Sequence, residues 1–436
     1  MPKGLTDHPQ RSALTAEVHA RPYACLEAPE RVTYLAMLSG EGGAADDLAH
    51  VGALFERFGQ APPEPGATHA MADFGAFRFK WERHSEFSSY SFFRHGPHDD
   101  ALFARTAIDE VPQDWLDGLP GERMAALRIE LLSSEAPEPG AKELAGLFPV
   151  ANFAGSLVAG GAAKAWMDFA MDTDGYGRVL LCDRSLRPRQ AGRTVQRLCE
   201  IEAYRMMALL AFPLAKSVGL EVSRGRDDLT AITERLGGIA DLADERRLLD
   251  ELTGISATVE KVATATAYRF GAARAYYALV RRRVEELREN RIEGTQTIGE
   301  FMERRLSPAM RTCEAVAERI DRLSTRVARA SDLLRTRVDI EVEAQNQKLL
   351  SSMDRRARLQ LRLQQTVEGL SVVAISYYLV GLVAYLAKAA KSRGLPVDAD
   401  LVAGLAVPVV LLVVWLGVKR IRRMVAGAGG QAAGKG

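Results

Sequence analysis

Two uncharged apolar runs near the C-terminus constrain this chain more than any other feature. Residues 369–387 (GLSVVAISYYLVGLVAYLA) and 401–418 (LVAGLAVPVVLLVVWLGV) contain no charged side chain. Because an α-helix rises about 1.5 Å per residue, each run is just long enough to cross a hydrocarbon core about 30 Å thick. The alternative is a buried helical hairpin in a soluble domain, but two such runs close together are difficult to bury in a protein core. We therefore predict a two-helix transmembrane hairpin over residues 369–418.

The charges beside the two runs predict their orientation. Four arginines precede the first run and four cations follow the second, namely Arg355, Arg356, Arg358, Arg362, Lys419, Arg420, Arg422 and Arg423. An excess of Lys and Arg is typical of cytoplasmic segments, and the polar N-terminus carries no signal peptide. With its Ala- and Arg-rich, bacterial-looking composition, the chain is predicted to cross the bacterial inner membrane twice with both termini cytoplasmic. Lys419, Arg420, Arg422 and Arg423 are then interfacial anchors, and residues 419–436 form a basic cytoplasmic tail.

Composition and motifs argue against several functional classes. The 57 Lys and Arg residues nearly balance the 56 Asp and Glu residues, so we expect no nucleic-acid partner. The four cysteines are scattered, which excludes a CxxC metal or redox motif. Nucleotide-binding, GxSxG and HExxH motifs are absent. We predict no enzyme activity, no cofactor and no catalytic or metal-binding residues.

Two short motifs have a metal-binding interpretation that the sequence disfavours. The segment 172–175 (DTDG) resembles the start of a calcium loop, but ligands at loop positions 5 and 12 are missing. A hairpin turn is the favoured interpretation. His95 and His98 have HxxH spacing around a Gly-Pro turn, and no third ligand stands nearby.

The first part of the chain predicts a mixed α/β sheet domain. After an N-terminal arm (1–30), residues 32–38 read as a buried strand. Around Phe79, apolar and charged residues alternate as in a strand with one face exposed to solvent. Further strand patterns follow as far as Cys182, and we expect about seven strands with interspersed helices in a cytoplasmic head over residues 31–187.

Helical periodicity replaces the strand pattern after residue 187. We expect a helical region over 188–306, with breaks at residues 237–238 and at Gly254, and a long stalk helix over 307–368 that begins at Ser307-Pro308. Its apolar seam, typical of a coiled coil, comprises Cys313, Val316, Ile320, Leu323, Val327, Ala330, Leu334, Val338, Val342, Gln345, Leu349 and Met353. If the helix continues through the first apolar run it is a rod about 120 Å long; the alternative is a broken helix folded on itself. The predicted fold class is α+β.

Two resemblances extend these expectations. The arm sequence HPxRxxLxxEVHARP and the terminal hairpin, which ends VWLGVKRIRR, resemble a bacterial family of predicted membrane-anchored proteins of unknown function. The arm motif includes His8, Glu17, His19, Arg21 and Pro22, to which the resemblance assigns no role.

The order of parts is also similar to that of the CorA-type magnesium channels. That resemblance implies a funnel-shaped pentamer in which the first span lines a pore. CorA-type channels carry Gly-Met-Asn where the first span ends, whereas this chain has residues 384–391 (AYLAKAAK) there. The departure puts magnesium selectivity of that kind in doubt.

Two functional hypotheses follow. The first is a homo-oligomer in the lipid bilayer, pentameric if the CorA resemblance extends to assembly, that conducts or senses ions, with a divalent cation as a candidate ligand. Tyr377, Tyr378, Gly381 and Tyr385 would then line a pore or pack the spans. The alternative is a non-conducting, membrane-tethered scaffold, favoured by the absence of charge inside either span.

Overall fold

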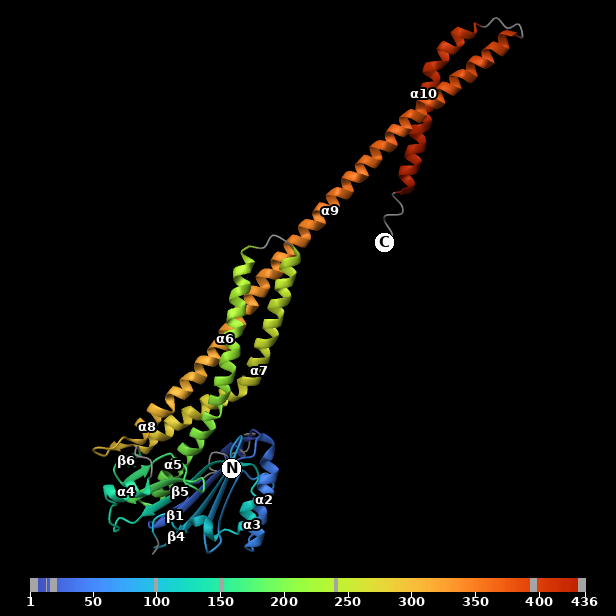
Figure 1. Cartoon of the computed structure of the whole chain (residues 1–436). Helices are drawn as coiled ribbons and strands as arrows, with labels where there is room; N and C mark the ends of the chain where they lie inside the picture. The colour runs from blue at the N-terminus through green and yellow to red at the C-terminus, as the bar shows by residue number, and fades with distance from the viewer. Residues whose placement is uncertain are drawn as a thin grey trace. The chain divides into compact units, whose positions relative to one another are not determined.

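The computed structural model describes residues 7–12, 14–15, 22–97, 101–148, 153–238, 242–392 and 398–429, and gives no side-chain detail for 399 and 421–429. The chain divides into two compact units, Met1–Asp332 and Leu333–Gly436. Each unit is described separately below. The predicted α+β class is confirmed, since a mixed sheet is followed by long helices (Figure 1).

A nine-stranded sheet forms the base of the first unit. Its strands are β1 (Glu30–Leu38), β2 (His69–Asp73), β3 (Arg78–Arg83), β4 (Ser88–His95), β5 (Glu122–Leu132), β6 (Ala154–Val158), β7 (Ala163–Met167), β8 (Gly177–Asp183) and β9 (Asn290–Arg291). They lie in the order β2-β3-β4-β1-β5-β8-β7-β6-β9. Only β5 and β8 pair in parallel, so this ladder joins two antiparallel halves.

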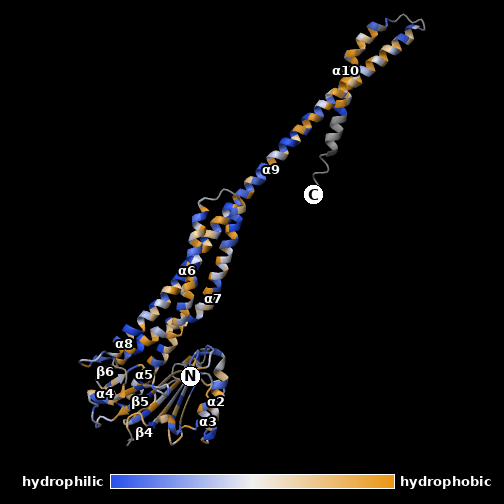
Figure 2. Cartoon of the chain, in the orientation of Figure 1, coloured by the Kyte–Doolittle hydropathy of each residue, from blue (hydrophilic) through white to orange (hydrophobic). Residues whose placement is uncertain are grey.

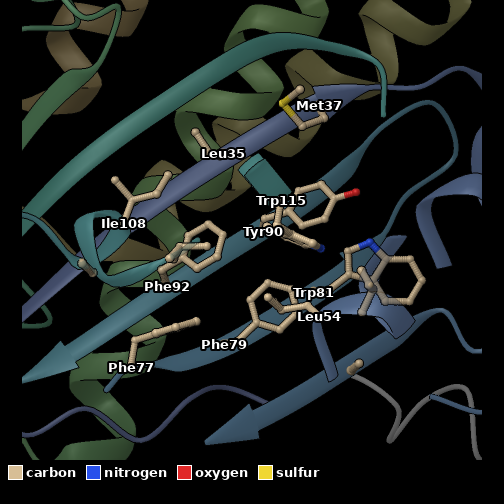
Figure 3. Close-up of a cluster of buried hydrophobic side chains, with 14 of the residues drawn as sticks. Leu35, Met37, Leu54, Phe77, Phe79, Trp81, Tyr90, Phe92, Ile108 and Trp115 are labelled. Carbon is tan, nitrogen blue, oxygen red and sulfur yellow. The ribbon is translucent and has the colours of Figure 1, made fainter. Parts of the chain in front are cut away.

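Aromatic side chains fill one face of the sheet. Phe79 and Trp81 of β3 point to the same side as Tyr90 and Phe92 of β4, and all four are fully buried (Figure 3). Trp115 packs edge-on against Phe79 with ring centroids 6.0 Å apart. Helices α2 (Ala44–Arg57) and α3 (Gln113–Asp117) cover this face, with η1 (Glu41–Gly43) and η2 (Ala107–Glu110) beside them. Each such side chain contributes about 1.5–3 kcal/mol by leaving water.

The opposite face of the sheet is polar, yet it is also buried. The sequence predicted solvent exposure for the charged residues of β3, but Lys80 and Glu82 are only 4% and 8% exposed. Helix α5 (Pro188–Leu209) covers them, and Gln196 of α5 accepts a hydrogen bond from Lys80. The alternation in β3 was read correctly as a strand, but the assignment of its polar face to solvent was wrong.

Three helices pack together in the first unit beyond the sheet. These are α6 (Ala211–Leu236), α7 (Leu242–Leu287) and the first part of α9 (Ser307–Ser392). Gly225 of α6 allows close approach, since a Cβ there would lie 3.2 Å from Leu323 of α9. A cavity of about 690 Å³ lies between the three helices. The predicted breaks at residues 237–238 and 254 had different outcomes: α6 ends before Gly237, but α7 runs through Gly254 without interruption.

The region predicted to be helical contributes one strand to the sheet. After α7, the two residues of β9 pair with Ser156 and Leu157 of β6. Helix α8 (Ile298–Arg305) follows, and its Thr297 cap accepts a hydrogen bond from the backbone N–H of Glu300. Helix α4 (Ala141–Leu147) lies near the same half of the sheet. The sheet therefore depends on residues far beyond the predicted head boundary at 187.

The second unit contains the rest of α9 and α10 (Ala399–Gly429). Helix α9 begins at Ser307, as predicted, and continues without a break for 86 residues. The alternative of a broken helix is therefore wrong. Helix α10 accommodates Pro408 inside its span. Orange, apolar residues are concentrated in α10 and the last turns of α9 (Figure 2).

The close approach of α5 to the N-terminal segment generates a stability prediction. A Cβ at Gly192 would lie 1.6 Å from the carbonyl oxygen of Ala24. Gly192→Ala therefore forces α5 and the backbone at Ala24 apart. We expect a loss of about 1–3 kcal/mol or more, measured as a lower thermal midpoint in detergent. Gly254→Ala is the matched control, because its Cβ would meet no atom within 4 Å and α7 should gain about 0.5–1 kcal/mol. Equal midpoints for the two variants would contradict the packing described.

Candidate functional site

Among the residues that the structure describes, three helical segments are long and apolar enough to cross a membrane. They are Pro188–Leu236, Ile298–Ser392 and Asp400–Arg420. In the most apolar window of each, 33%, 11% and 6% of the residues are buried, in that order. The first segment is α5 and α6, which pack in the first unit. The other two segments contain the two apolar runs of the predicted hairpin, and few residues of their most apolar windows are covered by the chain itself.

One narrow face of the hairpin is buried. Ser376 and Ala387 of α9 are 5% and 7% exposed and stand three helical turns apart, and Val414 of α10 is 8% exposed. These are small or β-branched residues, which allow apolar helices to approach closely. The Ser376 hydroxyl has no hydrogen-bond partner among the described residues. Ser376, Ala387 and Val414 are thus the points at which the described part of the hairpin is covered.

The residues predicted to line a pore or pack the spans lie on the outside of the hairpin. Tyr377, Tyr378 and Tyr385 are 77%, 76% and 75% exposed. A Cβ at Gly381 would meet no described atom within 4 Å. The structure therefore brings the three tyrosines and the glycine to an open helix surface, away from the contact made by Ser376.

The structure describes the side chains of Lys419 and Arg420 among the predicted interfacial anchors. Lys419 extends over Trp415, with Nζ 4.6 Å from the ring centroid. An amphipathic ring beside a cation is typical of a membrane–water boundary. Arg420 is exposed, whereas the side chains of Arg422 and Arg423 lie outside the described residues.

The arm motif is described only in part. The Nδ1 atom of His8 accepts a hydrogen bond from the backbone N–H of Gln10 at 3.2 Å, and Pro22 is exposed. Glu17, His19 and Arg21 lie outside the described residues. The structure therefore assigns no site to this motif.

The apolar seam of α9 changes its environment along the helix. Val316, Ile320, Leu323 and Val327 are at most 4% exposed. Further along, Gln345 is exposed, and Leu349 and Met353 of the same seam are each 62% exposed. Other large apolar residues of this stretch are also open to solvent, namely Ile340, Leu350, Leu359, Leu361, Leu363 and Val367. We call residues 340–367 the open segment of α9.

A buried polar layer connects the sheet to the helices of the first unit. The Nζ atom of Lys80 lies 3.0 Å from both Glu82 Oε1 and Gln196 Oε1. The Gln196 amide donates to Glu200 at 2.8 Å, and Glu200 pairs with Arg283 of α7. Charges at this depth are tolerated because each has a partner. Sequence reasoning missed this layer, since nothing in the strand pattern says what covers its polar face.

Three titratable groups near the sheet are buried and have raised pKa values. Burial raises the pKa of the Cys182 thiol to about 12 and that of Cys199 well above its usual range, which makes both thiols poor nucleophiles. Burial also raises the pKa of Glu130 to about 7, while its carboxylate accepts the backbone N–H of Phe103 at 3.0 Å.

The weak metal motifs have structural partners. Asp172 accepts backbone N–H groups of Asp174 and Tyr176 at 3.0 Å each, and pairs with Arg128. The turn prediction for residues 172–175 is confirmed. A ring nitrogen of His95 lies 3.0 Å from the Glu27 carbonyl oxygen, and His98 lies outside the described residues. Within the described part of the chain, no three His, Cys, Asp or Glu side chains are grouped to hold a metal ion.

Comparison with known proteins gives one family. The family described as "Protein of unknown function (DUF3422)" matches residues 6–425, and the chain belongs to it. A search of curated proteins found no match. Among solved structures, the chain is similar to one described as "structure of the full-length CmaX protein", at 15% sequence identity over 68% of this chain and 89% of that chain. The TM-score is 0.18, which does not establish a shared fold.

Proposed function

We propose that this protein is a non-enzymatic, homo-oligomeric protein of the bacterial inner membrane that spans the bilayer twice through residues 369–418. The single observation that carries the proposal is the lack of cover on the two most apolar windows, where only 11% and 6% of the residues are buried. Hydrocarbon is the solvent that such surfaces require, and a helix satisfies its own backbone groups there. Both termini and the sheet are cytoplasmic in this proposal.

The α5–α6 segment is not a third span in this proposal. Helix α5 lies on the sheet, and its Glu202 and Arg205 form an ion pair with oxygen and nitrogen 2.5 Å apart. Extraction of these charges into a bilayer would cost several kcal/mol and would uncover the polar face of the sheet. A two-span topology therefore accounts for all three apolar segments.

The open segment of α9 supports self-association. Leu349 and Met353 continue the same seam that is covered at Val316–Val327, yet they lie open in a single chain. Copies held in one bilayer with the same orientation are parallel, so identical stretches of α9 stand at the same height and meet in register. If the α9 seam of one copy packs against the α9 seam of another, the exposed leucines become buried as in a parallel coiled coil. A second copy of this chain is thus the proposed partner, and the CorA resemblance implies a ring such as a pentamer.

Ion passage or ion sensing is the second candidate function. The observation that favours it is the row of hydroxyl groups on the outer hairpin surface, at Tyr377, Tyr378 and Tyr385. In a ring of copies this surface would face either lipid or a central axis, and phenol groups on the axis would offer hydrogen bonds to a hydrated ion. A membrane-tethered scaffold without conduction is the competing assignment.

Cysteine accessibility tests the topology. The Cys25→Ser protein serves as background, because Cys25 is exposed and the other three cysteines are buried. In intact spheroplasts, a membrane-impermeant maleimide should label Ser392→Cys, and it should label Ser351→Cys only after permeabilisation. Equal labelling of both variants in intact spheroplasts would refute the two-span orientation.

Mass measurement tests self-association. Light scattering in detergent, corrected for bound detergent, should give a whole multiple of the 47.6 kDa chain mass. The Leu349→Glu/Met353→Glu variant should shift toward the monomer, since charges at the seam repel. Ser351→Glu is the matched control: it stands between the two positions but on the opposite side of α9, and should leave the mass unchanged. A monomeric wild-type protein would remove the oligomer and with it any pore.

Flux measurements separate the two candidate functions. For an ion-conducting ring, liposomes containing the wild-type protein should release potassium or magnesium faster than protein-free liposomes. Tyr378→Ala should then change the rate at least severalfold, while the mass in detergent stays the same. Rates equal to those of empty liposomes would leave the scaffold as the surviving function.

A further inference from the structure

The first unit contains a second, smaller cavity. It has a volume of about 340 Å³ and is formed where β7 ends, between α5 and α8. Its principal lining residues are Asp168, Phe169, Arg205, Phe301, Arg305 and Leu209. The volume is in the range of sites for small organic molecules.

An acidic side chain is buried in this cavity. Asp168 is 6% exposed. Its Oδ1 atom accepts the backbone N–H of Ala170 at 3.1 Å. Burial raises the pKa of this carboxyl group. A buried carboxylate is stabilised by a ligand that donates hydrogen bonds or carries positive charge.

Two guanidinium groups line the same cavity. Arg205 is held by Glu202 through two hydrogen bonds of 3.0 and 2.5 Å. Arg305, in the last turn of α8, is exposed and forms no ion pair with any described residue. Its guanidinium group is therefore available to a ligand carboxylate, for which its planar shape is well suited.

An aromatic wall completes the cavity. The rings of Phe169 and Phe301 are stacked, with centroids 4.4 Å apart and planes 20° from parallel. Phe169 has a φ of 55°, a left-handed conformation that is strained for a large side chain. Such strain persists where neighbours hold it, and it is found disproportionately at ligand clamps. The Asp168–Ala170 hydrogen bond and the stacking on Phe301 hold Phe169 in this conformation.

We propose that the cavity binds a free α-amino acid with an apolar side chain. The ammonium group would meet Asp168, the carboxylate would meet Arg305, and the side chain would lie against Phe169 and Phe301. A simple anion would be repelled by Asp168 and a simple cation by Arg305, whereas Arg205 is already paired with Glu202. A ligand with both charges offers a partner to Asp168 and to Arg305. This binding is independent of membrane insertion, so failure of either proposal leaves the other intact.

Calorimetric titration of the full-length protein in detergent tests the proposal. L-Leucine and L-phenylalanine are the probes. The matched analogues of leucine are 4-methylpentanoate, which lacks the ammonium group, and 3-methylbutan-1-amine, which lacks the carboxylate. The wild-type protein should bind leucine or phenylalanine at least tenfold more tightly than either analogue binds. Absence of binding by both amino acids, or equal binding of the analogues, would overturn the proposal.

Variants locate the binding. Arg305→Gln and Asp168→Asn should each weaken binding at least tenfold. Arg304→Gln is the control, because Arg304 stands next to Arg305 but bonds to Gln296. If Asp168→Asn fails to fold, Arg305→Gln still decides, since Arg305 is exposed and without an ion-pair partner among the described residues. Wild-type affinity in Arg305→Gln would overturn the assignment of the cavity.

Discussion

The polar layer between the sheet and α5 is the interaction on which the first unit depends. Lys80, Glu82 and Gln196 bring charge and amide groups into a region closed to water, where an unpaired group costs several kcal/mol. Lys80 and Glu82 pair within β3, but Gln196 meets Lys80 only when α5 lies in one register on β3, and the Glu200–Arg283 pair extends that requirement to α7. The aromatic face supplies a large apolar cluster, but it does not by itself fix where α5 and α7 sit.

In the hairpin the situation is reversed, because apolar groups and not polar groups lack partners within the chain. In the sheet, polar groups are removed from water and must find partners. In residues 369–418, apolar groups have almost no cover from the chain, and Ser376 is a rare buried polar side chain. The polar groups of the buried layer in the first unit therefore find their partners within the chain. The apolar surface of the second unit has to be covered by lipid or by another molecule.

Much of the fold could be predicted from the sequence, and the exceptions have physical causes. The period-2 pattern around Phe79 and the Ser307-Pro308 start are local signals, and both were read correctly. Strand β9 has two residues, too few for any periodicity, and it exists only because β6 offers an edge. Gly254 does not end α7, because neighbouring turns on both sides stabilise the helix. The cavity at Asp168 could not be foreseen, since Arg205 and Arg305 come from helices distant in the sequence. The boundaries of the predicted domains and the role of the arm motif remain predictions.

The late position of β9 also sets an order of events during synthesis. The edge of β6 is completed only after α5, α6 and α7 have been made, because β9 follows α7 in the chain. The first apolar run begins at residue 369, well after Arg291. At translation rates of about 5–20 residues per second, an interval on the order of seconds separates the two. The whole sheet can therefore close around its buried charges while the most aggregation-prone part of the chain has not yet been translated.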